Sequence, residues 1–168
     1  MKRTILMLCK ACLCIFALIL MGKLGLLYRQ WQREDALILA AARGDAYTMQ
    51  SLLKNGVDVN ATLGHRTKPG TGDTALITAT RRRHGAIVEL LLKYGANVNF
   101  QGTSGRTALM EAAECDDANL VRTLLQAGAN VNLVAAYGGT ALDAASLNSE
   151  VARLLQQAGA RSGKQDDK

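Results

Sequence analysis

The sequence is poor in aromatic residues, proline and cysteine, and its excess positive charge is confined to one end. Aromatic residues make up 4 % of the 168 residues, and there is a single proline. The net charge is +6, but residues 1–33 carry six basic residues and no acidic one, which leaves fourteen of each sign in the remainder. Because a nucleic-acid-binding protein carries its positive charge on the folded domain, we expect no nucleic acid partner.

Few residues of the types used in catalysis occur beyond the N-terminal segment. Cys115 is the only one of four cysteines past residue 14, so no internal disulfide can form there. His65 and His84 are the only histidines, and no Ser-His-Asp, Cys-His or metal-ligand set can be assembled. We therefore expect no enzymatic activity, no cofactor and no metal site. A small thiol-dependent enzyme or inhibitor that uses Cys115 is kept as an alternative.

The first feature that the sequence does contain is an apolar N-terminal run. Residues 5–21 are apolar except for Lys10; a helix of that length spans about 25 Å, close to the ~30 Å core of a bilayer. Tyr28 and Trp31 follow beside Arg29 and Arg33, as in the aromatic belt at a membrane surface. We expect residues 1–33 to form a signal anchor, with a single transmembrane helix, and a linker. The alternative is a cleaved secretory signal.

Four segments of the remaining chain align with one another. Their anchor leucines, at positions 37, 76, 109 and 142, are separated by 39, 33 and 33 residues. Each segment has an alanine-rich stretch, then an amphipathic stretch, and it ends at a glycine. This pattern predicts two helices joined by a turn, with the glycine in a left-handed conformation after the second helix. One such pair cannot bury its apolar side alone, so we expect the repeats to stack.

Each first helix begins at a residue suited to capping. Thr74, Thr107 and Thr140 precede the alanine-rich stretch in three repeats, and Asp35 occupies that place in the first. Their side-chain oxygens are expected to accept from the free N–H groups of the first turn.

Two motifs recur in register. Gly-x-Thr-Ala-Leu begins at Gly72, Gly105 and Gly138, and Leu-Leu-x-x-Gly-Ala-x-Val-Asn ends both middle repeats. On these motifs, residues 34–163 resemble the ankyrin repeat family. The resemblance implies an all-α solenoid of stacked helix-turn-helix units with β-hairpin-like turns, preceded by the N-terminal hydrophobic helix. Repeats are expected at about 34–62, 72–101, 105–134 and 138–163, before a polar tail at 164–168. Arg83 and Asp116 depart from the family, which has a glycine between the helices. His84 matches the structural histidine that the family has there, so the resemblance implies a local capping role for it.

The resemblance also implies a function. Ankyrin repeats bind proteins through a concave face made of turn tips and first helices, so we expect a monomeric, membrane-tethered adaptor or scaffold whose partner is another protein. The alternative is a periplasmic or secreted form, released by signal cleavage, that binds or protects a partner enzyme. By position alone, the variable contact residues of the family fall on Asp73, Arg81, Arg82, Thr103, Ser104, Arg106, Glu114, Cys115, Ala136, Tyr137, Leu147 and Asn148.

Overall fold

The computed structural model describes residues 23, 25–62, 72–147 and 149–163. The chain divides into two compact units, Met1–Arg33 and Glu34–Lys168. In the first unit, the described residues 23 and 25–33 are helical and exposed to solvent. The predicted anchor, residues 5–21, lies outside the described residues. Among those that are described, no helix combines the length and the apolar character needed to cross a bilayer.

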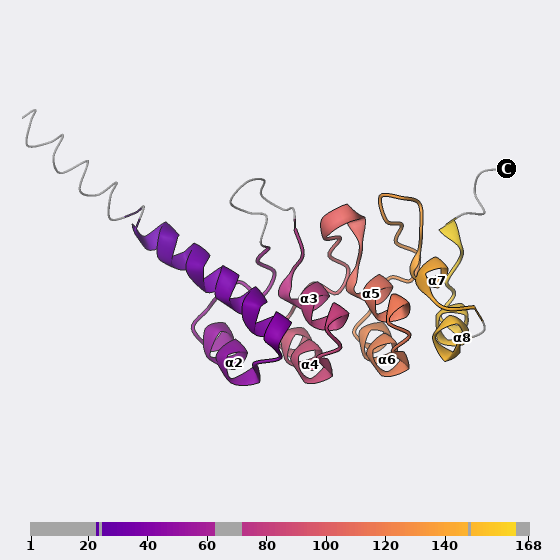
Figure 1. Ribbon diagram of the computed structural model, residues 1–168, viewed down its shortest axis with the longest axis horizontal. Coiled ribbons are helices and arrows are strands. Elements are labelled where there is room, and N and C mark those ends of the chain that lie inside the picture. Colours follow the sequence, from indigo (N-terminus) through magenta and orange to yellow (C-terminus); the bar gives the residue numbers. More distant parts are fainter. Residues whose placement is uncertain (1–22, 24, 63–71, 148, 164–168) are drawn as a thin grey trace, which may run out of the picture. The chain divides into compact units, whose positions relative to one another are not determined.

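The second unit is a stack of helix pairs. After helical residues 34–43 come α2 (Ala46–Lys54), α3 (Ala75–Arg81), α4 (Gly85–Lys93), α5 (Ala108–Glu114), α6 (Ala118–Gln126), α7 (Ala141–Ala144) and α8 (Glu150–Gln157). Figure 1 shows α3, α5 and α7 in one layer and α2, α4, α6 and α8 in the other. The described residues contain no strand, only an isolated antiparallel bridge between Thr62 and Thr74. The prediction of an all-helical solenoid is therefore confirmed.

The turns between repeats are hairpin-like only in their tips. One tip is closed by the hydrogen bond from the Gly102 N–H to the Arg106 carbonyl at 2.8 Å, around a 3₁₀ turn at Thr103–Gly105. The next is closed by the bond from the Ala135 N–H to the Gly139 carbonyl at 2.9 Å. Each tip thus stands off the first-helix layer as a closed loop.

Threonine capping is observed in the second to fourth repeats. The hydroxyl oxygens of Thr74 and Thr107 accept from N–H groups three residues on, at 3.4 and 3.3 Å. Thr140 forms a capping box with Asp143, which orders the first turn of the shorter α7. The capping prediction for Asp35 is wrong, because the helix runs from residue 25 to residue 43 and Asp35 lies inside it. The N–H groups that it would cap belong to an interior turn, and its Oδ1 is buried without a hydrogen-bond partner.

His84 also differs from its predicted role. It is the N-cap residue of α4, but its side chain makes no capping hydrogen bond there. Its Nε2 instead lies 3.3 Å from the carbonyl oxygen of Ala42 in the preceding repeat. The ring packs against Gly44, where an added Cβ would come within 3.0 Å of it. His84 therefore joins two repeats rather than capping its own helix.

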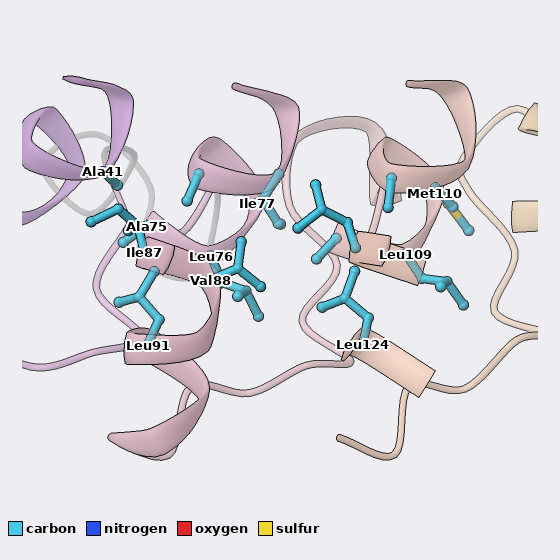
Figure 2. Close-up of a cluster of buried hydrophobic side chains, with 14 of the residues drawn as sticks. Ala41, Ala75, Leu76, Ile77, Ile87, Val88, Leu91, Leu109, Met110 and Leu124 are labelled. Atoms are coloured by element: carbon cyan, nitrogen blue, oxygen red, sulfur yellow. The ribbon is translucent and has the colours of Figure 1, made fainter. Parts of the chain in front are cut away.

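One hydrophobic core runs through the stack. Leu37, Leu76 and Leu109, from the first helices of three repeats, are fully buried. Figure 2 shows Leu76 and Leu109 in one buried cluster with Leu91 and Leu124 of the second helices. The equivalent Leu142 is only partly buried, since among the described residues no helix pair packs on the far side of α7 and α8. The core depends on stacking, as the repeat pattern predicts.

The last repeat is closed by the chain that follows α8. The Asp143 carboxylate accepts from the backbone N–H of Gly163 at 2.8 Å and from the Ser162 hydroxyl at 2.5 Å. The Thr140 hydroxyl donates to the Arg161 carbonyl at 2.8 Å. Residues 161–163 therefore take the place of a further turn against α7, which protects the open end of the stack.

Candidate functional site

The predicted contact residues lie at the ends of first helices and on the turn tips. We call this surface the first-helix face: the exposed sides of α3, α5 and α7 together with tips 101–106 and 133–139. Asp73 directly precedes α3, Arg81 is its last residue, and Glu114 is the last residue of α5. Arg82 and Cys115 are the C-cap residues of α3 and α5. Asn148 lies outside the described residues.

Five charged side chains on this face form one network across two repeats. The buried Glu111 carboxylate accepts from Arg81 Nε at 2.9 Å and Nη2 at 3.2 Å, and from Arg106 Nε at 2.6 Å. Arg81 Nη2 also lies 2.8 Å from Asp73 Oδ2. Arg106 makes a second ion pair with Glu114. The charges alternate in sign, so each arginine is held between two carboxylates and its planar head group is fixed in direction.

The network changes the proton affinity of its members. Burial acts to raise the pKa of Glu111, but hydrogen bonds and charge attraction from Arg81 and Arg106 outweigh it and lower that pKa below 4.5. The pKa of Arg81 is raised, first by its hydrogen bonds to Glu111 and then by Asp73. Both shifts favour the charged forms of Glu111 and Arg81, which lie at the centre of the network.

Hydrogen bonds between neighbouring tips position the rest of the face. Asp73 Oδ1 accepts from the Thr103 N–H at 2.9 Å. The Ser104 carbonyl accepts from the Ala136 N–H at 2.9 Å, with Ser104 itself in the left-handed region at φ 61°. Since these bonds run from each tip to the next, the tips form a continuous ridge beside the charged network.

Two hollows open on the first-helix face. The larger, of about 520 Å³, lies over the network and is lined by Arg81, Arg106, Glu111, Glu114 and Cys115. The smaller, of about 200 Å³, lies between α5, α7 and the last tip, and is lined by Arg106, Met110, Ala135, Tyr137, Gly139, Thr140, Asp143 and Ala144. Arg106 is shared, so a charged hollow adjoins a mainly apolar one. Among the described residues, no group of three or more His, Cys, Asp or Glu could hold a metal ion.

The structure brings most of the predicted residues together and leaves two apart. Asp73, Arg81, Arg106, Glu114 and Cys115 surround the larger hollow or its network, while Thr103 and Ser104 support the tip and Ala136 and Tyr137 form the next one. Arg82 is exposed and makes no ion pair with any residue that the structure describes. Leu147 is 95 % exposed and lines a separate hollow with Ala152 and Gln156 at the end of the stack.

Sequence reasoning missed Glu111, the centre of the network. It lies in the middle of α5, where its neighbours Met110 and Ala112 are buried. A charge among small apolar helix residues is a usable signal, because a buried carboxylate requires cations or donors nearby. Which cations approach it depends on the stacking of α3 against α5, since Arg81 is thirty residues away in the chain.

Comparison with known proteins identifies the repeats. A family model described as ankyrin repeats (3 copies) matches residues 5–102, 37–135 and 98–166. The chain belongs to the ankyrin repeat family. Membership indicates protein–protein interaction as its class of function, since ankyrin repeat proteins are typically interaction modules without enzymatic activity.

Two relatives share part of this ankyrin chain. Ankyrin repeat domain-containing protein 40 of Homo sapiens is 38 % identical over 79 residues, which is 47 % of this chain and 20 % of that protein. The protein of the same name in Mus musculus is 37 % identical over 79 residues, with the same coverage. The match thus spans about a fifth of the relatives' length, so their likeness concerns the repeats and leaves the rest of those proteins unmatched.

Proposed function

We propose that this protein is a membrane-tethered ankyrin adaptor that binds another protein through its first-helix face. The partner's chain lies across the tips, with an apolar side chain in the smaller hollow and polar groups over the charged network. The N-terminal apolar segment holds the repeats at a membrane, and the chain acts as a monomer.

The observation that carries this proposal is the exposure of Tyr137 beside a preformed hollow. Tyr137 is 88 % exposed although it lines the smaller hollow with Met110 and Ala144. A cavity of about 150 Å³ suffices for a benzene ring, so 200 Å³ accommodates one apolar or aromatic side chain. Tyrosine and arginine are enriched where proteins bind one another, because each offers a rigid body with hydrogen-bonding ends. Tyr137 and Arg106 both line this hollow.

The charged network supports specificity rather than strong attraction. Its two arginines and three carboxylates are already paired with one another and leave a formal charge of only −1, so a partner gains little from adding one more charge. The network instead presents hydrogen-bond donors and acceptors whose side chains are already held in place in the folded protein. A partner whose charged group has the wrong sign at one position would deprive a charged side chain of the network of its ion pair.

Site-specific crosslinking tests the binding face. A photoreactive benzoylphenylalanine is placed at Tyr137, or at Tyr47 as the control, in the full chain in its native cells. Tyr47 lies on α2 in the other layer and is 86 % exposed, so it matches Tyr137 in residue type and accessibility. We expect a discrete protein adduct from position 137 and none from position 47. Equal adducts at both positions, or none at 137, would contradict a partner on the first-helix face.

Extraction of membranes at alkaline pH tests the tether. A chain that spans the bilayer stays in the membrane pellet, whereas a released or peripheral chain passes into the supernatant. N-terminal sequencing of the recovered protein then separates an anchor from a cleaved signal. A soluble protein beginning near residues 23–32 would reject the tether and leave the binding face to be judged by crosslinking alone.

A further inference from the structure

The part of the 25–43 helix that belongs to the first unit, residues 25–33, has unusual surface chemistry. Every described residue in 25–33 is exposed, yet several are large and apolar: Leu26 is 67 % exposed, Tyr28 is 56 % exposed and Trp31 is 37 % exposed. Leu27 is exposed as well. In water, such a helix leaves apolar area uncovered on a stretch where charged residues would be usual. The residue types therefore point to an environment that is partly apolar.

The charges on this helix have one sign. Lys23, Arg29 and Arg33 are exposed cations, and residues 1–33 contain no acidic residue. Glu34 and Asp35 follow on the same helix but are buried and partly buried, so the exposed charges of residues 25–33 are all positive. They create a local positive field that salt reduces over about 10 Å at 0.1 M. A surface that complements this helix must therefore be anionic.

We propose that Lys23 and residues 25–33 form a collar that lies in the headgroup layer of an anionic membrane and binds lipid phosphates through Lys23, Arg29 and Arg33. This inference rests on the proposed tether and adds the chemistry of the surface that the tether meets. The amphipathic rings of Tyr28 and Trp31 suit the boundary between acyl chains and water, because one end of each ring system is polar. The long arginine side chains reach the phosphates while their stems cover apolar surface.

A membrane fits this helix better than a protein groove does. Leu27, Tyr28 and Trp31 share one side of the helix, since residues three and four apart lie on the same face, and Arg29 and Arg33 share the opposite side. A helix with an aromatic, apolar side and a cationic side lies in the plane of a headgroup layer, with its apolar side toward the acyl chains. The proposed tether precedes this helix in the chain and would bring it to a bilayer surface, which favours lipid over a protein groove.

Trp31 provides the probe for this inference, because it is the only tryptophan in the chain. The full chain is reconstituted into vesicles of phosphatidylcholine alone, or with one third phosphatidylglycerol, and floated on a density gradient. Tryptophan emission and its quenching by lipids brominated near the headgroup are then recorded at low and high salt. Trp31→Phe gives the background from the four tyrosines.

We expect a blue-shifted emission and quenching about twofold stronger in the anionic vesicles at 0.1 M salt, with the difference lost in 1 M salt. The double variant Arg29→Gln/Arg33→Gln should float equally but lose the dependence on anionic lipid. The matched control, Arg153→Gln/Arg161→Gln, removes the same charge from exposed positions in the last repeat and should behave as the parent.

The outcomes separate the two proposals. If the chain floats with vesicles of both lipid compositions but Trp31 emits as it does in water, the collar is overturned while the tether stands. Quenching that ignores lipid charge, salt and the arginine substitutions would overturn the role of the phosphates. Failure to float in either composition would overturn the tether and the collar that depends on it.

Discussion

Asn99 and Asn130 join consecutive repeats through side chain and backbone. The Asn99 Oδ1 accepts from the Asn130 N–H at 2.7 Å, while the Asn99 Nδ2 donates to the Gly128 carbonyl at 3.3 Å. The same link runs from the Asn60 side chain to the Asn97 N–H at 2.7 Å and from Asn132 to the Arg161 N–H at 2.9 Å. Each Val-Asn ending therefore supplies the amide that orders the next turn, and the links form a ladder along the whole stack.

Replacing Asn99 tests the ladder at its centre. Asn99→Ala leaves the Asn130 N–H and the Gly128 carbonyl without their partner, and both are at the surface, where water replaces part of the loss. We expect the free energy of unfolding to fall by about 1–2 kcal/mol, measured by urea denaturation of the full chain in mild detergent. The control is Asn119→Ala, because among the described residues the Asn119 side chain bonds only to Arg122, one helical turn away. A similar loss there would contradict the ladder.

Glu111 should matter more for stability than its neighbour Glu114. Glu111→Gln removes a buried charge from between Arg81 and Arg106 and leaves both arginines short of a counter-ion. Breaking a buried ion pair costs 3–5 kcal/mol, but Arg81 is half exposed, so we expect a loss of about 2 kcal/mol. Glu114→Gln at the exposed end of the network should cost less than about 0.5 kcal/mol. Equal losses in the two variants, by urea denaturation, would mean that Glu111 does not organise the network.

The repeats were predictable because their signals are local. Thr74 and Thr107 cap helices within three residues of themselves, and Gly95 and Gly128 adopt positive φ at the ends of second helices. Each of these roles is fixed by a residue type and its immediate neighbours. Repetition of the same signals then specifies stacking, since one helix pair cannot bury its apolar side.

The charged network and the first repeat were harder to predict from the sequence, because they depend on contacts between repeats and on residues upstream. Glu111 is important because stacking brings Arg81 onto it from another repeat, and no local pattern encodes that approach. Asp35 resembles the capping threonines by alignment, but residues upstream of it are also compatible with helix, so the helix does not begin there. His84 bonds to Ala42 in the preceding repeat for the same reason: its partner is chosen by tertiary contact.

Acid should weaken the closure at the end of the stack. Burial acts to raise the pKa of Asp143, but hydrogen bonds from Ser162, Thr140 and Gly163 outweigh it and lower the pKa from 3.8 to about 2. A lowered folded pKa means that the stabilisation is complete above pH 3.8 and disappears as the pH falls through about 2. Because Asp143 is partly open to solvent, we expect its contribution to be about 1 kcal/mol.

The variant Asp143→Asn isolates that contribution. Its free energy of unfolding should lie about 1 kcal/mol below the parent at pH 7, and the two should converge as the pH falls from 4 to 2. Glu89→Gln, on the exposed side of α4, is the control and should match the parent within a few tenths of a kcal/mol at pH 7. A difference for Asp143→Asn that persists unchanged at pH 2 would show that the carboxylate charge is not its source.

Asp116 offers a way to stabilise the fold. It takes the place of a glycine between two helices, and its backbone is left-handed at φ 53°, as is that of Gly44 at φ 73° in the equivalent turn of the first repeat. A residue with a Cβ in the left-handed region destabilises the folded state by about 1 kcal/mol. Glycine avoids this strain but makes the unfolded chain more flexible. We therefore expect Asp116→Gly to raise the free energy of unfolding by about 0.5 kcal/mol.

The same substitution should have the opposite sign where φ is negative. Ala127 is exposed at the C-cap of α6 with φ −77°, so Ala127→Gly relieves no strain and only adds freedom to the unfolded chain. We expect it to lower the free energy of unfolding by about 0.5–1 kcal/mol in the same urea titration. If both glycine variants were destabilised equally, backbone strain at Asp116 would be absent, and its left-handed turn would have to be stabilised by the carboxylate itself.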